Sequence, residues 1–498
     1  MSVIDIIAGA QIVDGHRPWP RAIVDDAGWQ LGIDHLVSGA WTLSGLWGDV
    51  GAVHMAVMAE SEAAVLTYRC RDGRFPSVGA RHLPAVRLER AICSLFGYEP
   101  AGASDTRPWL DHGVWGLACP LGDRGAPKVE PYVFLPVEGE ALHQVPVGPV
   151  HAGIIEPGHF RFTANGEFIV RVEERLGYVH KGIESLMAGA TIDRAARLAG
   201  RTSGDSTVAY ASAFARAVEA ATGTVPPARA VYLRALMAEL ERLANHFGDI
   251  GAICNDASFA LMHAQTGILR ERTLRAAEAC FGHRLMMDVV VPGGLARDVG
   301  ADGERAIRPL VAELRTSFPR LVELYDSTAS LQDRTVDAGI VKQAYARLFG
   351  AGGHVGRAAG RNFDARRTPG YAPYDDLQFE VPVLDAGDVN ARVWIRIREV
   401  EQSLSLIEQI LDRLPKGDLR TQVTVSGECE GMAYAEAFRG DLLVWLRLDA
   451  SGQVTRCHLR DASWFQWPLL EAAIENNIIA DFPLCNKSFN CAYSGHDL

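Results

Sequence analysis

The feature that most constrains the fold of this chain is a run of 29 residues in which apolar side chains recur at helical spacing. The run, PPARAVYLRALMAELERLANHFGDIGAIC (226–254), begins with two prolines, which are well tolerated at the start of a helix. Shorter runs of the same kind are TVAYASAFARAVEAATG (207–223) and VWIRIREVEQSLSLIEQILDRL (393–414). Together they predict a body built mainly of long helices.

Short β elements are predicted on both sides of the helical region. AVHMAVMAE (52–60) and AAVLTYRC (63–70) alternate like strands, and PAVRLERAICSLFGYEP (84–100) has helical spacing, so the N-terminal part predicts a mixed α/β domain. An Asn-Gly pair at 165–166 indicates a β-hairpin, and D-A-S-G (449–452) indicates a turn in a second β region. We therefore expect an α+β protein with an α/β domain (1–130), a linker (131–150) and a mainly helical body with small β elements (151–498).

Charge and composition exclude several classes of function. A formal net charge of −12 argues against a nucleic-acid partner, because phosphate binding needs clustered cations. The longest apolar runs fall short of the roughly 18 residues that a membrane span requires, so no direct span is expected. No Gly-x-Gly-x-x-Gly motif follows a predicted strand and there is no Walker loop, so the chain itself is not expected to bind NAD.

The cysteines argue against both a disulfide scaffold and a metal site. Nine cysteines are spread over 498 residues, and none forms a Cys-x-x-Cys pair. Cys485 and Cys491 come closest, but such cysteines are more often small buried side chains than ligands. A reducing cytoplasmic environment fits this pattern.

Several motifs occur in the same order as in one known family. The body contains LGYVHKGIESL (176–186), ELERLANHFGDIG (239–251) and PGYAPYDDLQFEVPVLDAGDVNARVWIRIREVEQSL (369–404). These resemble the large subunit of energy-converting nickel-iron hydrogenases of the formate hydrogenlyase type (group 4), and its relative, the quinone-site large subunit of respiratory complex I. In the N-terminal domain, FPSVGARHLPAVRLERAICSLFGYEP (75–100) resembles the small complex I subunit that docks beside that large subunit.

The resemblance implies where a nickel-iron centre would lie. In the hydrogenases, four thiolates from two Cys-x-x-Cys pairs hold the metals, and the first pair corresponds here to Ser203 and Ser206. Hydroxyl groups are poor nickel ligands. The positions of the second pair, in the two registers that fit, are Ala492 with Gly495 and Cys491 with Ser494. The chain is therefore expected to be a divergent member of the family that lacks the nickel-ligand cysteines and binds no metal.

The complex I relative implies a quinone site in the same region. Its tyrosine position corresponds to Gly204, and its histidine lies on a hairpin loop, where His151 and His159 are the candidates. We expect a polar cavity between the body and the C-terminal segment. Its expected lining consists of His151, Arg201, Ser203, Gly204, Asp205, Ser206, Cys491, Ala492, Ser494, Gly495 and Asp497. The alternative is a collapsed site whose polar residues only cap helices, with Ser203 capping a helix that begins near Ser206.

Three residues are candidates for catalysis through proton transfer. By the resemblance, Glu184 corresponds to the glutamate that begins a proton path in the hydrogenases, with Lys181 on the same turn and His159 on the hairpin. A carboxyl group partly removed from water is expected to have a raised pKa and to relay protons. The alternative is an exposed salt bridge between Lys181 and Glu184.

A glycine-rich segment carries four arginines, which are Arg357, Arg361, Arg366 and Arg367. They predict a loop near Asp364 that steers an acidic partner, or else a solvated face. In contrast, Glu241 in the long helix is interpreted as part of a packing stripe.

These observations predict a subunit of a membrane-associated redox complex, taking part in electron transfer coupled to proton or ion translocation. It would bind no cofactor itself, since iron-sulfur clusters would lie in partner subunits, and a quinone is a candidate acceptor. The expected partners are an iron-sulfur small subunit, a ferredoxin-like subunit and antiporter-like membrane subunits, which would hold the chain on the cytoplasmic face of the inner membrane. A non-catalytic structural or coupling subunit and a genuine nickel-iron hydrogenase are the alternatives.

Overall fold

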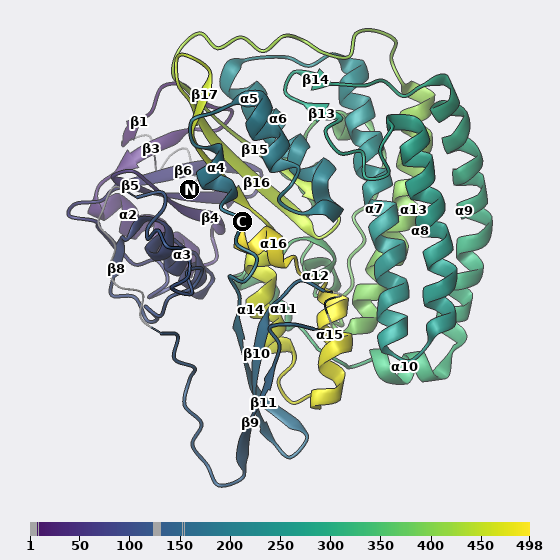
Figure 1. Cartoon of the computed structure of the whole chain (residues 1–498), viewed down its shortest axis with the longest axis horizontal. Helices are drawn as coiled ribbons and strands as arrows, with labels where there is room; N and C mark the ends of the chain where they lie inside the picture. Colours follow the sequence, from purple (N-terminus) through teal and green to yellow (C-terminus); the bar gives the residue numbers. More distant parts are fainter. Residues whose placement is uncertain (1–6, 8, 123–130, 152, 154) are drawn as a thin grey trace.

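The structure is a computed structural model that describes residues 7, 9–122, 131–151, 153 and 155–498 (Figure 1). The N-terminal domain contains a five-stranded sheet in the order β1-β3-β6-β5-β4. Its strands are β1 (Gln11–Ile12), β3 (Arg21–Val24), β4 (Thr42–Asp49), β5 (Ala52–Ala59) and β6 (Glu62–Arg69). The two alternating segments predicted as strands form the antiparallel pair β5–β6.

Two helices complete the N-terminal domain. α2 (Asp26–Val37) buries Trp29, Ile33 and Leu36, which recur at helical spacing. α3 (Val86–Phe96) confirms the helix predicted within 84–100. It ends at Gly97, whose φ of 69° is the left-handed conformation that glycine adopts without a steric penalty.

Four long helices form a bundle at the far side of the molecule from the N-terminal domain (Figure 1). They are α7 (Ala228–Asp256), α8 (Ala260–Phe281), α9 (Ala301–Ser327) and α13 (Val389–Arg413). α7 is the predicted long helix, and it packs against both α8 and α13. The α+β class with a mainly helical body is thus confirmed. Among the residues described, no helix is long and apolar enough to cross a membrane.

A second five-stranded sheet joins the two parts of the chain. Its centre is β15 (Cys429–Ala437), β16 (Gly440–Leu448) and β17 (Gln453–Arg460), with β12 (Ala190–Thr191) and β2 (His16–Arg17) at the edges. α6 (Thr207–Thr222) packs directly on β15. Gly431 permits this approach, because a Cβ at that position would lie 1.9 Å from the carbonyl oxygen of Ala217. β2 comes from the N-terminal segment, so the sheet ties that segment to the body.

A three-stranded antiparallel sheet projects from the body (Figure 1). β10 (His159–Asn165) and β11 (Phe168–Arg175) confirm the hairpin predicted at the Asn-Gly pair. β9 (Leu142–Val147) pairs with β10 and lies within the stretch predicted as a linker.

The arginine-rich segment is buried, contrary to prediction. Arg357 and Arg366 are almost inaccessible, whereas Arg361 is half-buried and Arg367 is exposed. The carboxylate partners of the two buried arginines, at N–O distances of 2.5 to 3.0 Å, are Glu239, Asp364, Glu399 and Glu436. Both a steering loop and a solvated face are therefore wrong for Arg357 and Arg366, because carboxylates from distant segments compensate their charges inside the core.

Candidate functional site

The loop from Ser203 to Ser206 is held by Arg439, which lies in the turn between β15 and β16. Arg439 is 4% exposed, and its Nη1 and Nη2 lie 2.8 and 2.6 Å from the two carboxylate oxygens of Asp205. Nη1 also donates to Ser206 Oγ at 3.3 Å, and Ser203 Oγ donates to Asp205 at 2.6 Å. The Nε of Arg439 donates to the carbonyl oxygen of Asn490. One guanidinium thus links the loop to the C-terminal segment.

Arg439 and Asp205 stabilise each other in the charged form. Burial raises the pKa of Asp205, but Arg439 and the two serine hydroxyls outweigh this effect and lower it to about 2. Burial acts to lower the pKa of Arg439, yet Asp205 holds it above its ordinary value. At neutral pH the two form an ion pair in which the guanidinium is buried and the side chain of Asp205 is 36% exposed, and loss of either partner would leave an uncompensated charge. We call Asp205, Arg439 and the serines Ser203 and Ser206 the cradle.

The C-terminal segment packs beside the cradle with its polar groups already bonded. The backbone N–H of Ala492 donates to Ser463 Oγ, and that of Ser494 donates to Glu156, both at 2.9 Å. Cys491 is buried, and burial raises the pKa of its thiol well above the usual range. A thiol in that environment is a poor candidate for a metal ligand.

Helix α16 (Tyr493–Asp497) fills the rest of the expected cavity. A Cβ at Gly495 would lie only 2.6 Å from a carboxylate oxygen of Asp461. Asp497 accepts the backbone N–H groups of Gly177 and Val179, each at 2.9 Å. Of the expected polar lining, Ser203, Asp205 and Ser206 bond to one another, whereas the C-terminal residues bond mainly to other segments of the chain.

These residues do not fit a nickel-iron centre. Soft thiolates select nickel and iron, whereas the cradle offers hydroxyl groups, one carboxylate and a guanidinium, whose charge repels a cation. Within the described ranges, no group of three or more His, Cys, Asp or Glu side chains could hold a metal ion. The residues that the resemblance assigns to the first pair of metal-ligand positions, Ser203 and Ser206, form part of a salt-bridged junction.

A small cavity of about 150 Å³ remains beside the loop, between α7 and α8. Gly204, Asp205 and Glu241 line it, together with Asn245 and Arg270. Ligand pockets usually measure roughly 300–1,000 Å³, so this cavity is small for a quinone ring.

Glu241 caps the N-terminus of α6 from the neighbouring helix α7. Its carboxylate accepts the backbone N–H groups of Val208 and Ala209 at 2.8 and 3.1 Å. Neither Ser203 nor Ser206 makes a side-chain cap, so the predicted cap at Ser203 is wrong. Burial raises the pKa of Glu241 to about 8, although the two N–H donors act to lower it. Sequence reasoning missed this role because the only signal was a glutamate within a packing stripe.

Lys181 and Glu184 do not pair with each other. Lys181 Nζ donates to the carbonyl oxygens of Arg201 and Thr202 at 3.0 and 2.7 Å, just before the cradle loop. Glu184 is 5% exposed, and its oxygens lie 2.7 Å from Arg456 Nη1 and 2.8 Å from His458 Nδ1. The alternative of an exposed Lys181–Glu184 bridge is therefore wrong.

The expected rise in the pKa of Glu184 is also wrong. Burial does act to raise this pKa, but Arg456 and His458 outweigh burial and lower it to about 2. The carboxylate thus stays ionised at neutral pH as the centre of a buried triad, in which Arg456 is the cation and burial lowers the pKa of His458. The role of Glu184 as a proton relay remains a hypothesis. Its contacts with Arg456 and His458 give this carboxylate a structural role in the fold.

The remaining candidate residues contact backbone carbonyl groups or a partner at the surface. The imidazole of His151 contacts the carbonyl oxygen of Gly158 at 2.8 Å, and that of His159 contacts Gly148 at 3.3 Å, so both are bonded within the hairpin region. Burial lowers the pKa of His159 below its usual value. Arg201 forms an exposed bidentate ion pair with Asp288, with Nη2 2.6 Å from Oδ2.

The fold and this site define a class of protein, the large subunits of hydrogenase-like redox complexes, in a form whose metal-ligand positions carry no thiolate pairs. Residues 257–430 match the family described as the 49 kDa subunit of respiratory-chain NADH dehydrogenase. The chain is 32% identical over 437 residues to formate hydrogenlyase subunit 5 of Escherichia coli (strain K12), covering 85% of this chain and 77% of that protein. It is 30% identical over 358 residues to a subunit of the NADH-quinone oxidoreductase of Desulfotalea psychrophila, covering 71% of this chain and 95% of the other.

A solved structure agrees with these relatives. The structure of the membrane-bound sulfane sulfur reductase, an archaeal respiratory membrane complex, contains a chain that superposes with a TM-score of 0.68 at 26% identity, covering 73% of this chain and all of the other. The chain therefore belongs to the family of large subunits shared by formate hydrogenlyase-type hydrogenases and complex I, an oxidoreductase family.

Proposed function

We propose that this chain is the large peripheral subunit of a membrane-associated redox complex, in which electron transfer from iron-sulfur partners is coupled to proton or ion translocation. The names of its relatives support this role, since they include a formate hydrogenlyase, a membrane-bound hydrogenase and NADH-quinone oxidoreductases. The chain performs it without a nickel-iron centre of its own. The observation that carries this last point is the guanidinium of Arg439 between Asp205 and Asn490.

The proposal includes specific partners and a location. The partners are an iron-sulfur small subunit, a ferredoxin-like subunit and antiporter-like membrane subunits, and the chain lies on the cytoplasmic face of the inner membrane, attached through them. Membership of a family whose relatives are parts of multi-subunit membrane complexes supports this arrangement. The chain itself binds no cofactor under this proposal.

Within such a complex, the closed cradle favours a coupling role over chemistry at the inherited centre. Arg439 pairs with Asp205 of the loop and donates to the carbonyl oxygen of Asn490 in the C-terminal segment, so a movement of either one is transmitted to the other through this side chain. A second candidate is reduction of a small acceptor, supported by the cavity of about 150 Å³ beside Gly204. A quinone head group would need this cavity to widen.

Metal analysis and turnover of the purified complex test these roles. We expect nickel well below one atom per chain and no hydrogen uptake. One nickel per chain would overturn the metal-free assignment. Quinone reduction that is lost in Ala277→Leu, which narrows the small cavity, but retained in Ala264→Leu, on the exposed face of the same helix, would replace the coupling role by the second candidate.

A further inference from the structure

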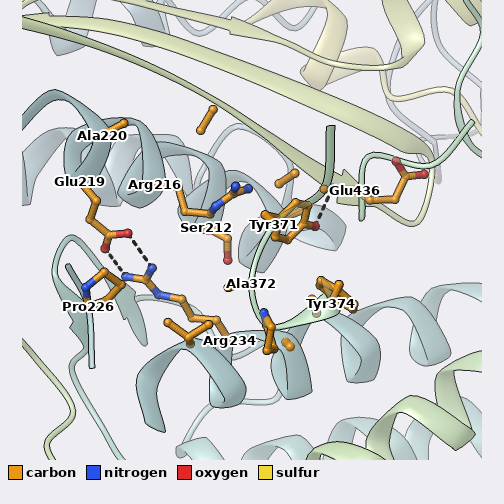
Figure 2. Close-up of a pocket in the computed structure, with 18 of the residues that line it drawn as sticks. Ser212, Arg216, Glu219, Ala220, Pro226, Arg234, Tyr371, Ala372, Tyr374 and Glu436 are labelled. Atoms are coloured by element: carbon orange, nitrogen blue, oxygen red, sulfur yellow. Dashed lines mark hydrogen bonds and ion pairs between the residues drawn. The ribbon is translucent and has the colours of Figure 1, made fainter. Parts of the chain in front are cut away.

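A larger cavity, of about 370 Å³, lies along the middle of α6. It is bounded by α6, α7, β15 and the loop of residues 370–374, and Figure 2 shows the side chains that converge on it. Most of its wall is apolar, made by alanine, proline, valine and methionine side chains, with Pro18 and Trp19 contributing from the N-terminal segment. Its size falls within the usual range of small-molecule sites, roughly 300–1,000 Å³.

One end of the cavity carries a pair of charges that compensate each other. Arg234 Nη2 and Nη1 lie 2.6 and 3.0 Å from the two oxygens of Glu219, as the dashed lines in Figure 2 indicate. Glu219 also accepts the backbone N–H of Gly293 at 2.8 Å. This pair is saturated, so it leaves no charge for a ligand to balance.

The other end carries three hydrogen-bond donors with capacity left over. Ser212 Oγ is buried without a hydrogen-bond partner in the described part of the chain. The hydroxyl of Tyr371 accepts the backbone N–H of Glu436 at 3.1 Å, which leaves its own hydrogen free to donate. Figure 2 shows the Ser212 side chain and the Tyr371 ring close together at the cavity, with the Tyr371 hydroxyl directed toward Glu436. Buried donors without acceptors are rare in proteins and indicate that a missing partner belongs there.

The third donor is the half-buried guanidinium of Arg216. It donates to the carbonyl oxygen of Tyr434 and lies 3.9 Å from the ring centroid of Tyr371. Across the residues described here, no carboxylate forms an ion pair with it. The Glu436 carboxylate is not free to do so, since it is bound by Arg357 at 3.0 Å and by the N–H of Ala365 at 2.9 Å. The charge left uncompensated at this end of the cavity is therefore positive.

We propose that this cavity binds a small apolar monocarboxylate. Its carboxylate accepts hydrogen bonds from Arg216, Ser212 and Tyr371, and its hydrocarbon body lies against the alanine, proline and methionine wall. Charge-assisted hydrogen bonds of this kind are roughly twice as strong as neutral ones, and guanidinium groups match carboxylates in shape. Aromatic and medium-chain aliphatic acids share this chemistry.

Binding would also strengthen the contact between the N-terminal segment and the body. Pro18 and Trp19 directly follow β2, and the Trp19 ring packs edge-on against Tyr434 with centroids 5.3 Å apart. A ligand in the cavity would add apolar contacts to both sides of this junction.

The test uses the full-length chain with decanoate and 4-biphenylcarboxylate, and with the amides of the same two acids as neutral probes. Calorimetry and thermal melting measure the binding. We expect both acids to bind and to raise the melting temperature by mass action, and the amides to bind about tenfold or more weakly. In Arg216→Met the preference for acid over amide should disappear, and in Ser212→Ala acid binding should weaken by a few-fold. Arg275→Met, at an exposed arginine of α8, is the matched control.

Four results would overturn the proposal. The first is equal affinity for acid and amide in the unmodified chain. The second is an acid preference that survives Arg216→Met, and the third is no binding of either acid. Ala220→Phe places a ring in the cavity, so binding that persists in this variant, with the fold verified by circular dichroism, would place the acid elsewhere and would also overturn it.

Discussion

Helix α6 borders two sites, and they differ in whether a carboxylate of the protein compensates the arginine charge. At its N-terminal end, the charge of the buried Arg439 is compensated by Asp205, and the hydrogen-bonding groups of both contact protein partners. Along its middle, Arg216 and Ser212 face a cavity with donors left over. The family resemblance predicts a reaction centre at the first site. Buried donors without protein partners in the described residues point to the second.

The largest expected effect comes from breaking the cradle. Arg439→Met removes a buried cation and leaves Asp205, whose side chain is 36% exposed, without its partner, so the cost should lie near the lower end of the about 3–5 kcal/mol typical of a fully buried pair. We expect the free energy of unfolding, measured by urea denaturation, to fall by that amount. The matched control is Arg201→Met, which breaks a similar bidentate pair with Asp288 at the surface and should cost under about 1 kcal/mol.

A double variant separates loss of a pair from burial of a lone charge. Asp205→Leu combined with Arg439→Met should recover most of the lost stability, since apolar side chains can replace a buried pair at little net cost. Equal losses in the free energy of unfolding for Arg439→Met and Arg201→Met would show that the cradle behaves like solvated surface. The cradle would then no longer differ from the cavity as a site whose charges are compensated within the protein.

The next largest expected effect on stability comes from Glu184, at the centre of its triad with Arg456 and His458. Glu184→Gln should lower the free energy of unfolding at pH 7 by about 3 kcal/mol, because the folded pKa of about 2 lies well below the ordinary value near 4.5. A depressed carboxyl pKa stabilises the fold above the unfolded pKa, and that stabilisation is lost as the pH falls through about 2. Denaturation from pH 7 to pH 3 should therefore show the gap between wild type and variant shrinking by about half. A constant gap would contradict an ionised Glu184.

The sequence predicted local structure well and long-range pairing poorly. The helix α7 and the hairpin at Asn165-Gly166 follow from periodicity and turn chemistry within a few residues. Burial of Arg357 could not be foreseen in the same way, since its partners Glu399 and Glu436 are 42 and 79 residues away in sequence and on different elements.

The same limit applies to the candidate site. Alignment of motifs identified Ser203 and Ser206 as positions without thiols, which needs only residue identity. It did not identify Arg439, since an arginine in a β-turn is normally exposed, and only the fold brings that turn to Asp205. The cavity along α6 could not be predicted from the sequence either, because its donors come from a helix and a distant loop.

Glu241 lies beside the first of the two sites, since it caps α6 and lines the small cavity next to Asp205. Its pKa is raised to about 8, so in the folded protein it holds its proton where the unfolded chain has lost it. Stability should therefore decrease as the pH rises from about 4.5 to about 8, by up to roughly 1.4 kcal/mol per unit. Glu241→Gln should remove this slope, and the exposed Glu278→Gln should not. An unchanged slope in Glu241→Gln would mean that the cap is ionised.

The smallest expected change in stability is at Arg216, although its expected effect on ligand binding is large. Arg216→Met loses one hydrogen bond to Tyr434 and the contact with the Tyr371 ring, each worth about 1 kcal/mol, but it also relieves the burial of an unpaired charge. Because these effects oppose each other, urea denaturation without ligand should show a difference within about 1 kcal/mol. In the presence of decanoate the gap should widen, since only the wild type gains stability from binding. A loss of about 3 kcal/mol or more without ligand would mean that Arg216 is a structural cation like Arg439, and the distinction between a filled site and an open one would fail.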